Sequence, residues 1–331
     1  MSPGQLAILD VGHGNAAVIR HEGWSAVIDA GPRSALLQFL SDEGITRLDV
    51  VVISHADEDH IAGLLVLISS GAFTFGKIRL NSDAEKGSKV WDDLAKALDD
   101  AQRAGTIDFL ASLTPAHNSE LDNAPVRLEI LGPTSYLAMK GPGAVDRQGR
   151  RITSNSISAV VRMWVGGDPI AIFPGDLDQI GLEELHAVGT TDLHARILVF
   201  PHHGGRPGAS VASGTFAAAL LSAVKPECVV FSIGRGVHGT PTPEVVEAIR
   251  RMTPAPRIAC TQLSEHCAQT VPAQSPSHLT ALVARGRERR SCCAGTIVVD
   301  FNDPGALLPS GGDHLAFIAT HAPTALCQRR S

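Results

Sequence analysis

The chain has 331 residues, of which 44% are hydrophobic and 19% are charged, so it can bury the core of a large α/β sandwich. Only 4% of the residues are aromatic, which excludes the base-stacking platform of a single-strand nucleic-acid binder. The net charge of −6 gives no overall attraction to a polyanion, and no apolar run of about 18 residues predicts a membrane span.

Short apolar strands alternate with Gly-rich loops and helical stretches along the chain. In the first half, strands are predicted over 6–11, 16–20, 25–28 and 49–53, and helices over 34–40, 61–68 and 91–104. In the second half, strands are predicted over 127–131, 158–165, 170–173, 197–200 and 228–233, and helices over 183–187 and 243–251. Metal-binding residue types stand only at the strand ends, which indicates stacked sheets flanked by helices with a site at one rim.

The densest cluster of metal-binding side chains is His55-Ala56-Asp57-Glu58-Asp59-His60, which follows a buried strand after one serine. So much carboxylate and imidazole in one loop is costly unless cations neutralise it. A solvated acidic turn is the alternative interpretation. Two further segments, Pro174-Gly175-Asp176 and Pro201-His202-His203-Gly204, follow predicted strands and can supply the missing ligands. The pattern therefore favours a metal site.

These motifs, with Asp29 at a strand end and Ser154-Asn155-Ser156, resemble the metallo-β-lactamase fold. More narrowly, the chain resembles the soluble hydrolase domain of ComEC-type DNA-uptake proteins, whose opening DVGQGDA corresponds to residues 10–16. The resemblance implies an α/β fold, a four-layer αβ/βα sandwich of two similar halves. It also implies a hydrolase domain over 1–300, with a Cys- and Arg-containing insertion at about 260–293, and a C-terminal extension over 301–331.

The resemblance implies two divalent ions held by one set of residues, namely His55, Asp57, Asp59, His60, Asp176 and His202. Asp59, His60 and His202 would hold one ion. His55 and Asp57 would face the other, with Asp176 bridging the two. Asp29 would orient the loop without binding metal. We favour His202 as the ligand and expect His203 to be a neighbouring or phosphate-contacting residue, and the alternative assignment stays open.

Two departures from the β-lactamase branch bear on the chemistry. Asp57 replaces a histidine, and Asn155 stands where a third histidine would arrive. The position next to His55 is thus richer in oxygen, which shifts its preference from Zn²⁺ towards Mn²⁺, with Mg²⁺ as a further alternative. We expect a two-metal phosphodiesterase or nuclease that uses a metal-bridging hydroxide on DNA, RNA or a nucleotide. The alternatives are a same-fold metallohydrolase of a non-phosphate ester, thioester or amide, and a metal-stabilised non-catalytic module of a larger assembly.

Catalysis is assigned to Asp59, Asp176 and His238, the last either protonating the leaving oxygen or only capping its loop. His13 and Asn15 replace the Gln and Asp of the ComEC-type motif. The remaining candidates for substrate contact or ligand support are His13, Asn15, Ser154, Asn155, His203 and Arg151. An arginine suits phosphate through its planar fork.

The C-terminal insertion raises two further hypotheses. Cys260, Cys267, Cys292 and Cys293 could form a structural zinc site, although their spacing is not CxxC, and reduced thiols are the alternative. Four arginines within 285–290 could touch a polyanion or a partner protein, with a solvated loop as the alternative. The N-terminus lacks the signature of a signal peptide, so we expect a cytoplasmic protein with reduced cysteines.

Overall fold

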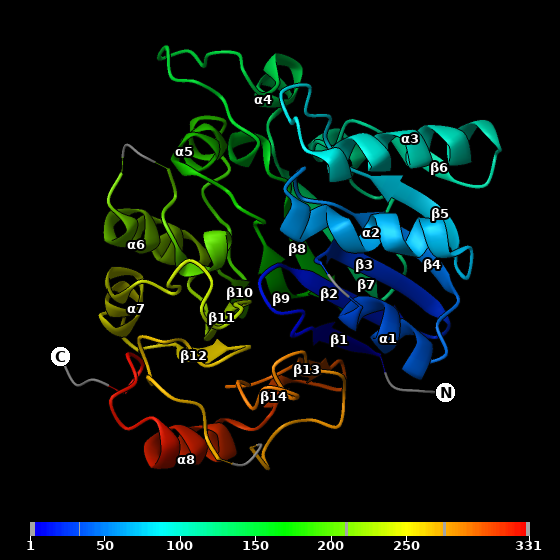
Figure 1. Cartoon of the computed structure of the whole chain (residues 1–331). Helices are drawn as coiled ribbons and strands as arrows, with labels where there is room; N and C mark the ends of the chain where they lie inside the picture. The colour runs from blue at the N-terminus through cyan, green and yellow to red at the C-terminus, as the bar shows by residue number, and fades with distance from the viewer. Residues whose placement is uncertain (1–3, 33, 209–210, 274–275, 329–331) are drawn as a thin grey trace.

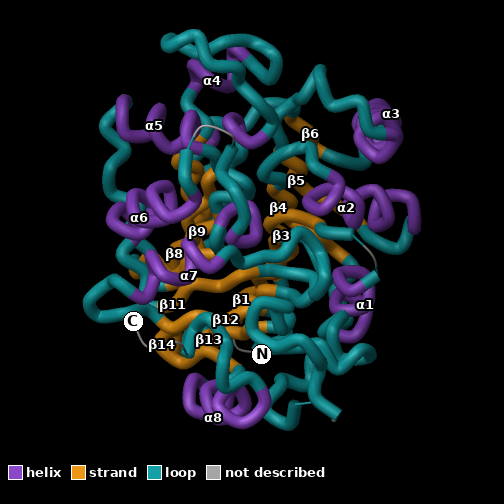
Figure 2. Tube along the Cα trace, turned by 60° about the vertical axis from the view of Figure 1, so that its left-hand side comes forward, coloured by secondary structure: helices purple, strands orange, loops and turns teal. Residues whose placement is uncertain are grey.

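The structure is a computed structural model that describes residues 4–32, 34–208, 211–273 and 276–328. Two sheets face each other in the middle of the molecule, and helices cover their outer faces (Figure 1). Figure 2 shows the strands enclosed between these helices from a second direction. Of the helices in the described ranges, none combines the length and apolar character that crossing a lipid bilayer requires.

The first sheet has eight strands in the order β14-β13-β1-β2-β3-β4-β5-β6. Their bounds are β1 Gln5–Ile8, β2 Ala16–His21, β3 Trp24–Ala30, β4 Arg47–Val52, β5 Thr74–Arg79, β6 Asp108–Leu110, β13 Ile297–Asp300 and β14 Asp303–Leu308. The helices α1 Ala35–Asp42, α2 Glu58–Ser70 and α3 Lys89–Arg103 pack on its outer face.

The second sheet has six strands in the order β12-β11-β10-β9-β8-β7. Their bounds are β7 Val126–Gly132, β8 Val160–Val165, β9 Asp168–Phe173, β10 Ile197–Val199, β11 Cys228–Phe231 and β12 Arg257–Cys260. The longer helices of this half are α5 Gln179–Ala187, α6 Ser213–Val224, α7 Pro243–Arg250 and α8 Gly311–His321. The shorter ones are α4 Ser135–Lys140 and the 3-10 turns η1 Pro115–His117, η2 Asn155–Ile157 and η3 Pro201–Gly204.

Strand β4 illustrates why the sheets stack. Val50 and Val52 face the core between the two sheets, whereas Val51 and Ile53 face the core under α1, α2 and α3. Both faces of the strand are therefore buried, as its continuous apolar sequence predicts. Each such side chain contributes about 1.5–3 kcal/mol by leaving water.

The predicted strands and helices up to residue 251 exist, with bounds shifted by a few residues. The predicted start of the helix over 61–68 was wrong, because α2 begins earlier, at Glu58, with Asp57 as its N-cap. Acidic residues are favoured in the first turn of a helix, so this part of the metal motif is also a helix start. Local sequence patterns did not predict β5, β6, β12, β13, β14, α4, α6 or α8.

The last residues pack onto both halves of the sandwich. β14 pairs antiparallel with β13 at the edge of the first sheet. In α8, Phe317 and Ile318 join the core on the outer face of the second sheet. The division of the chain at residue 300 stays a prediction.

Candidate metal centre

The loop that follows β4 is held in place by Asp29, the penultimate residue of β3. The two strands are parallel neighbours, so their carboxyl ends meet at one edge. The buried carboxylate of Asp29 accepts hydrogen bonds from Ser54 N at 2.7 Å and Ser54 Oγ at 2.9 Å, and contacts His60 Nδ1 at 2.8 Å. Because a carboxylate only accepts, the Nδ1–H of His60 donates, and its Nε2 faces away from Asp29.

Carboxylates control the protonation of His60, which is fully buried. Burial alone would lower the pKa of this imidazole. The charges of Asp29, Asp59 and Asp176 outweigh that effect and hold the pKa of His60 well above its usual value. Three carboxylates from both halves therefore surround this imidazole.

Asp176 arrives from the second half, on the turn after β9. Gly175 permits this turn with φ +55°, and a Cβ there would lie 2.3 Å from Ser158 Oγ and 2.4 Å from Ser54 Cβ. The backbone N–H of Asp176 donates to Ser158 Oγ at 3.1 Å. Burial would raise the pKa of Asp176, but neighbouring histidines, led by His202, hold it well below its usual value.

Within the described residues, two groups of three side chains have ligand atoms close enough to share an ion, all within 4.8 Å of one another. The groups are His55, His60 and Asp176, and His13, Asp59 and His203. The Nε2 atom of His60 lies 3.5 Å from Asp176 Oδ1 and 3.9 Å from Asp59 Oδ2, so the two groups adjoin.

These residues fit divalent ions. The Nε2 atoms of His55, His60 and His202 are buried and have no hydrogen-bond partner, a costly state for polar atoms that a metal ion would relieve. Three of the side chains keep some solvent access, with exposed fractions of 32% for Asp57, 26% for Asp59 and 17% for His13. Substrate can therefore reach the centre from the side of these three residues.

His202 and His203 differ in what they contact. Both have left-handed backbone angles, with φ +52° and +55°. His203 Nε2 lies 3.0 Å from Asp59 Oδ2, and its Nδ1 lies 2.6 Å from the carbonyl oxygen of Ser232. His202 lies beside Asp176 instead, with 3.6 Å between Nδ1 and Oδ2. The geometry thus places His203, the less favoured of the two histidines, in a ligand group, while the choice of His202 stays a prediction.

Asp57 lies beside the first group but is also paired with a lysine. Its Oδ1 is 3.7 Å from His55 Nε2 and 2.5 Å from the ammonium of Lys86. Lys86 belongs to the loop between β5 and α3, and it was not among the residues predicted for the site. A fixed cation therefore stands next to the oxygen-rich position.

Ser154 and Arg151 support the loop that carries Lys86. Ser154 Oγ donates to Asp83 at 2.6 Å, and the Arg151 guanidinium pairs with Glu85 at 2.6 Å. Asn155 begins η2, and its carbonyl oxygen accepts a bond from Ser158 N. The roles of Ser154, Asn155 and Arg151 in substrate contact or ligand support stay predictions.

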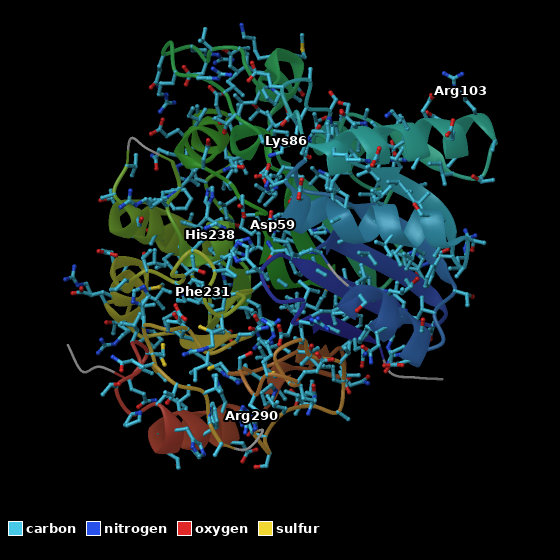
Figure 3. The ribbon with its side chains drawn as sticks, in the orientation of Figure 1. Asp59, Lys86, Arg103, Phe231, His238 and Arg290 are labelled. Atoms are coloured by element: carbon cyan, nitrogen blue, oxygen red, sulfur yellow. The ribbon has the colours of Figure 1, made fainter. Side chains whose placement is uncertain are left out.

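His13, Asn15 and His238 come together near Asp59. The His13 ring lies 4.8 Å from that of His238, centroid to centroid. Asn15 N donates to the carbonyl oxygen of Asp59 at 3.1 Å, so Asn15 supports the motif through its backbone. Burial, reinforced by His203, lowers the pKa of His13 to about 4. Figure 3 shows Asp59 and His238 near the middle of the molecule, between the two halves.

Asp10 ties the His13 loop to the C-terminal insertion. Its buried carboxylate accepts hydrogen bonds from Gly12 N, Gln262 Nε2 and Gly286 N at 2.8–3.1 Å. Burial raises the pKa of this carboxyl group. From the sequence, Asp10 is only one position of a motif, because its partners lie far away along the chain.

The four cysteines proposed for zinc do not converge. Cys292 Sγ lies 3.5 Å from Asp10. The other three, Cys260, Cys267 and Cys293, border a small cavity together with Cys327. The two groups at the rim are the only metal-ligand clusters in the described part of the chain, so a four-cysteine zinc site is not formed in this geometry.

Two of the four arginines in the insertion donate hydrogen bonds to the backbone of their own loop. Arg287 donates to the carbonyl oxygens of Thr280 and Leu282, and Arg290 donates to that of Ala273. Figure 3 shows Arg290 near the bottom of the view and Asp59 near its middle. Contact of these arginines with a polyanion stays a prediction.

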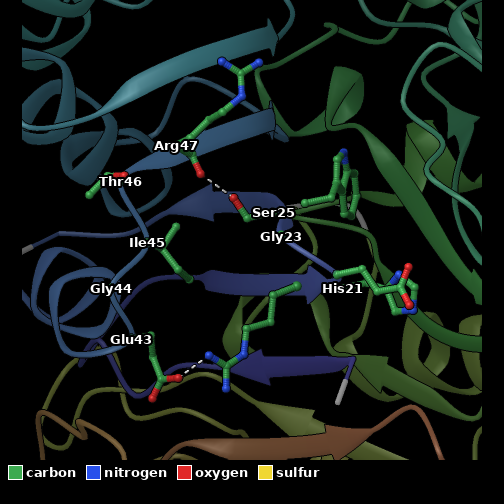
Figure 4. A pocket seen from close by; sticks show the side chains of 11 residues that line it. His21, Gly23, Ser25, Glu43, Gly44, Ile45, Thr46 and Arg47 are labelled. Atoms are coloured by element: carbon green, nitrogen blue, oxygen red, sulfur yellow. Dashed lines mark hydrogen bonds and ion pairs between the residues drawn. The ribbon is translucent and has the colours of Figure 1, made fainter. Parts of the chain in front are cut away.

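A cavity of about 570 Å³ lies at the other end of β3 and β4 (Figure 4). Its cations are neutralised locally, because Arg20 pairs with Glu43 and Arg47 pairs with Asp49. Ser25 Oγ donates to the carbonyl oxygen of Arg47 at 2.5 Å and closes this end of the strand pair. None of the described residues that line this cavity belongs to either ligand group, so the cavity is separate from the candidate metal centre.

A sequence profile of the Metallo-beta-lactamase superfamily matches residues 9–227, more than half of the chain. The chain belongs to this superfamily. Membership confirms the predicted fold and indicates a metal-dependent hydrolase. A solved structure that matches this chain is that of the metallo-beta-lactamase fold protein YhfI from Bacillus subtilis. The two chains are 14% identical, and the match covers 78% of this chain and 96% of that chain. The TM-score of this match is 0.46.

Two curated relatives confirm the ComEC-type resemblance. The chain is 26% identical over 255 residues to Competence protein ComA of Neisseria gonorrhoeae, covering 74% of this chain and 29% of that protein. It is 22% identical over 272 residues to ComE operon protein 3 of Bacillus subtilis (strain 168), covering 76% and 31%. The chain thus spans less than a third of the length of these relatives.

Proposed function

We propose that this superfamily member is a phosphodiesterase or nuclease that uses two divalent ions, Mn²⁺ or Zn²⁺, on DNA, RNA or a nucleotide. The observation that carries the proposal is the pair of adjoining ligand groups, one around Asp176 and one around Asp59. Paired ion sites of this kind serve phosphatases and nucleases, where they stabilise both the attacking and the leaving oxygen.

The protein's own residues prepare the site. When bound, the ions would supply Lewis-acid activation of a phosphoryl oxygen and of water. Asp29 fixes the tautomer and direction of His60, and Ser232 does the same for His203 through its carbonyl oxygen. Asp176 accepts a hydrogen bond from the backbone N–H of His202, which fixes its carboxylate within the second half, 3.5 Å from His60 Nε2 of the first half.

Lys86 and His238 are our candidates for substrate contact. Lys86 lies on the accessible side of the centre, beside Asp57, where its ammonium can face a phosphate oxygen. His238 lies next to His13 on a loop with φ +56°, and its imidazole would give a proton to the leaving oxygen. Ser154 and Arg151 would act through the Lys86 loop that they hold.

Turnover assays test this proposal. The purified protein is incubated with a chromogenic phosphodiester, single- and double-stranded DNA, RNA and cyclic nucleotides, each with Mn²⁺, Mg²⁺ or Zn²⁺. We expect turnover of at least one phosphodiester, and its loss in Asp176→Ala. Asp168→Ala is the matched control, because Asp168 is an exposed carboxylate at the start of the same strand, β9.

A chromogenic ester, a thioester and a lactam form the comparison arm of the assay. Hydrolysis of one of these, with no phosphodiester turned over in any metal, would refute the proposal in favour of a non-phosphate substrate. No turnover of any substrate by metal-loaded protein would favour the non-catalytic module.

A further inference from the structure

His13 was predicted to contact substrate or to support the ligands, yet it lies in one of the two ligand groups. Its Nε2 lies 3.6 Å from Asp59 Oδ2, and His203 Nε2 approaches the same oxygen at 3.0 Å. The three ligand atoms lie within 4.8 Å of one another. Two imidazole nitrogens and one carboxylate oxygen thus converge on one point at the accessible side of the centre.

The loop around His13 is built to hold this position. Asp10 anchors the loop start through Gly12 N at 3.1 Å. Gly14 lets the loop pass the motif, because a Cβ there would lie 2.4 Å from the carbonyl oxygen of Asp59. Gly234 packs against the loop from the second half, since a Cβ there would lie 2.5 Å from His13 N. Contacts from both halves therefore fix His13 relative to Asp59.

We propose that His13 is a protein ligand to the ion held by Asp59 and His203, which makes this position nitrogen-rich. Imidazole nitrogen favours Zn²⁺, whereas carboxylate oxygen favours Mn²⁺ and Mg²⁺. The group of His55, His60 and Asp176 has a second carboxylate beside it, because Asp57 Oδ1 lies 3.7 Å from His55 Nε2, so that position has the larger share of oxygen. The two positions are therefore chemically unequal, with Zn²⁺ bound on the His13 side.

This inference rests on the proposed function only in that the rim binds metal. It does not depend on the substrate. It also concerns a residue that departs from the ComEC-type motif, in which glutamine occupies this position.

Metal titration of the purified, metal-stripped protein tests the inference. Zn²⁺ binding is measured by competition with a chromophoric chelator, and the Co²⁺-loaded protein is examined by visible absorption spectroscopy. We expect His13→Gln to lose at least tenfold in affinity for one of two Zn²⁺ ions and to change the Co²⁺ spectrum. His238→Gln is the matched control for metal binding, because its imidazole lies 4.8 Å from His13 but belongs to neither ligand group.

A second variant guards against misfolding of the first. His13→Asp keeps a ligand but exchanges nitrogen for oxygen, so we expect the preference of that position to shift from Zn²⁺ towards Mn²⁺. Wild-type affinities and a wild-type Co²⁺ spectrum in both variants would overturn the inference. Wild-type protein that binds two ions without phosphodiester turnover would refute the proposed function and leave the role of His13 standing.

Discussion

Replacing Asp29 by asparagine separates the support of a ligand from the ligand itself. The carboxylate accepts from Ser54 N, Ser54 Oγ and His60 Nδ1 at 2.7–2.9 Å, and it is 2% exposed. An asparagine has the same shape, but its amide group has lost the charge and one of the accepting oxygens. If the amide faces His60, it favours the tautomer that carries the proton on Nε2, where a metal ion would bind.

The expected magnitude follows from these contacts. Loss of a supporting carboxylate costs about 10–100-fold in metal affinity, or roughly 1.4–2.8 kcal/mol. The metal-free protein should also lose about 1.5–3 kcal/mol in its free energy of unfolding, because the buried hydrogen bonds that the Asp29 carboxylate accepts are weakened. Both quantities are measurable, by chelator competition and by urea denaturation of stripped protein.

Asp49→Asn is the matched control. Asp49 joins the same two strands at their other ends, accepting from Ser25 N at 3.0 Å and Arg47 Nε at 2.6 Å. We expect this variant to bind metal as the wild type does. A folded Asp29→Asn protein with unchanged metal affinity would show that Asp29 does not control the His60 ligand.

Three further outcomes are expected. Gly175→Ala should destabilise the fold by about 2–4 kcal/mol in urea denaturation, since the new Cβ meets side chains at 2.3–2.5 Å as well as a left-handed φ. Gly23→Ala is the control, because a Cβ there meets open space and only the φ of +85° is unfavourable, so its loss of stability should be smaller. Equal losses of stability in the two variants would contradict a steric clash at Gly175. Lys86→Met should tighten metal binding near Asp57 by up to about fivefold, because the ion pair no longer competes; unchanged affinity would exclude that competition. His314→Gln should flatten the loss of stability between pH 7 and pH 5, and a wild-type pH slope in this variant would refute that assignment.

The sign and size of the His314 effect follow from its burial. Desolvation, followed by the charge of Arg257, lowers the pKa of His314 to about 3 in the folded chain, against about 6.5 when unfolded. Between these values the unfolded state binds more protons, so stability falls as the pH drops. The loss amounts to about 2 kcal/mol from pH 7 to pH 5.

Local sequence patterns predicted the strands that carry the site. The strand segment from Val50 to Ile53 is buried on both faces, and a strand of this kind is recognised in the sequence as a continuous apolar run. The position of Asp29 at a strand end could also be predicted, because the apolar residues that form the strand are its neighbours in sequence. The start of α2 was misplaced since Asp57 and Asp59 serve both as helix-start residues and as candidate ligands.

Contacts between distant residues could not be predicted from these patterns. Lys86 reaches Asp57 from a loop with no recognisable motif. Which of His202 and His203 points to the metal centre depends on the left-handed backbone angles of both residues. A sequence pattern of a buried strand followed by two histidines does not predict these angles. Cys292 contacts Asp10 because the insertion folds back onto the loop that follows β1. The spacing of the cysteines in the sequence does not predict this contact.

The pairing of β1 has a consequence for biosynthesis. This strand lies between β2 and β13, with Leu6 opposite Val299, so one edge of β1 stays open until the ribosome has made nearly the whole sandwich. At about 5–20 residues per second, that interval is on the order of tens of seconds. An open apolar strand edge invites association between nascent chains, so we expect fragments that stop before β13 to aggregate or to need a chaperone.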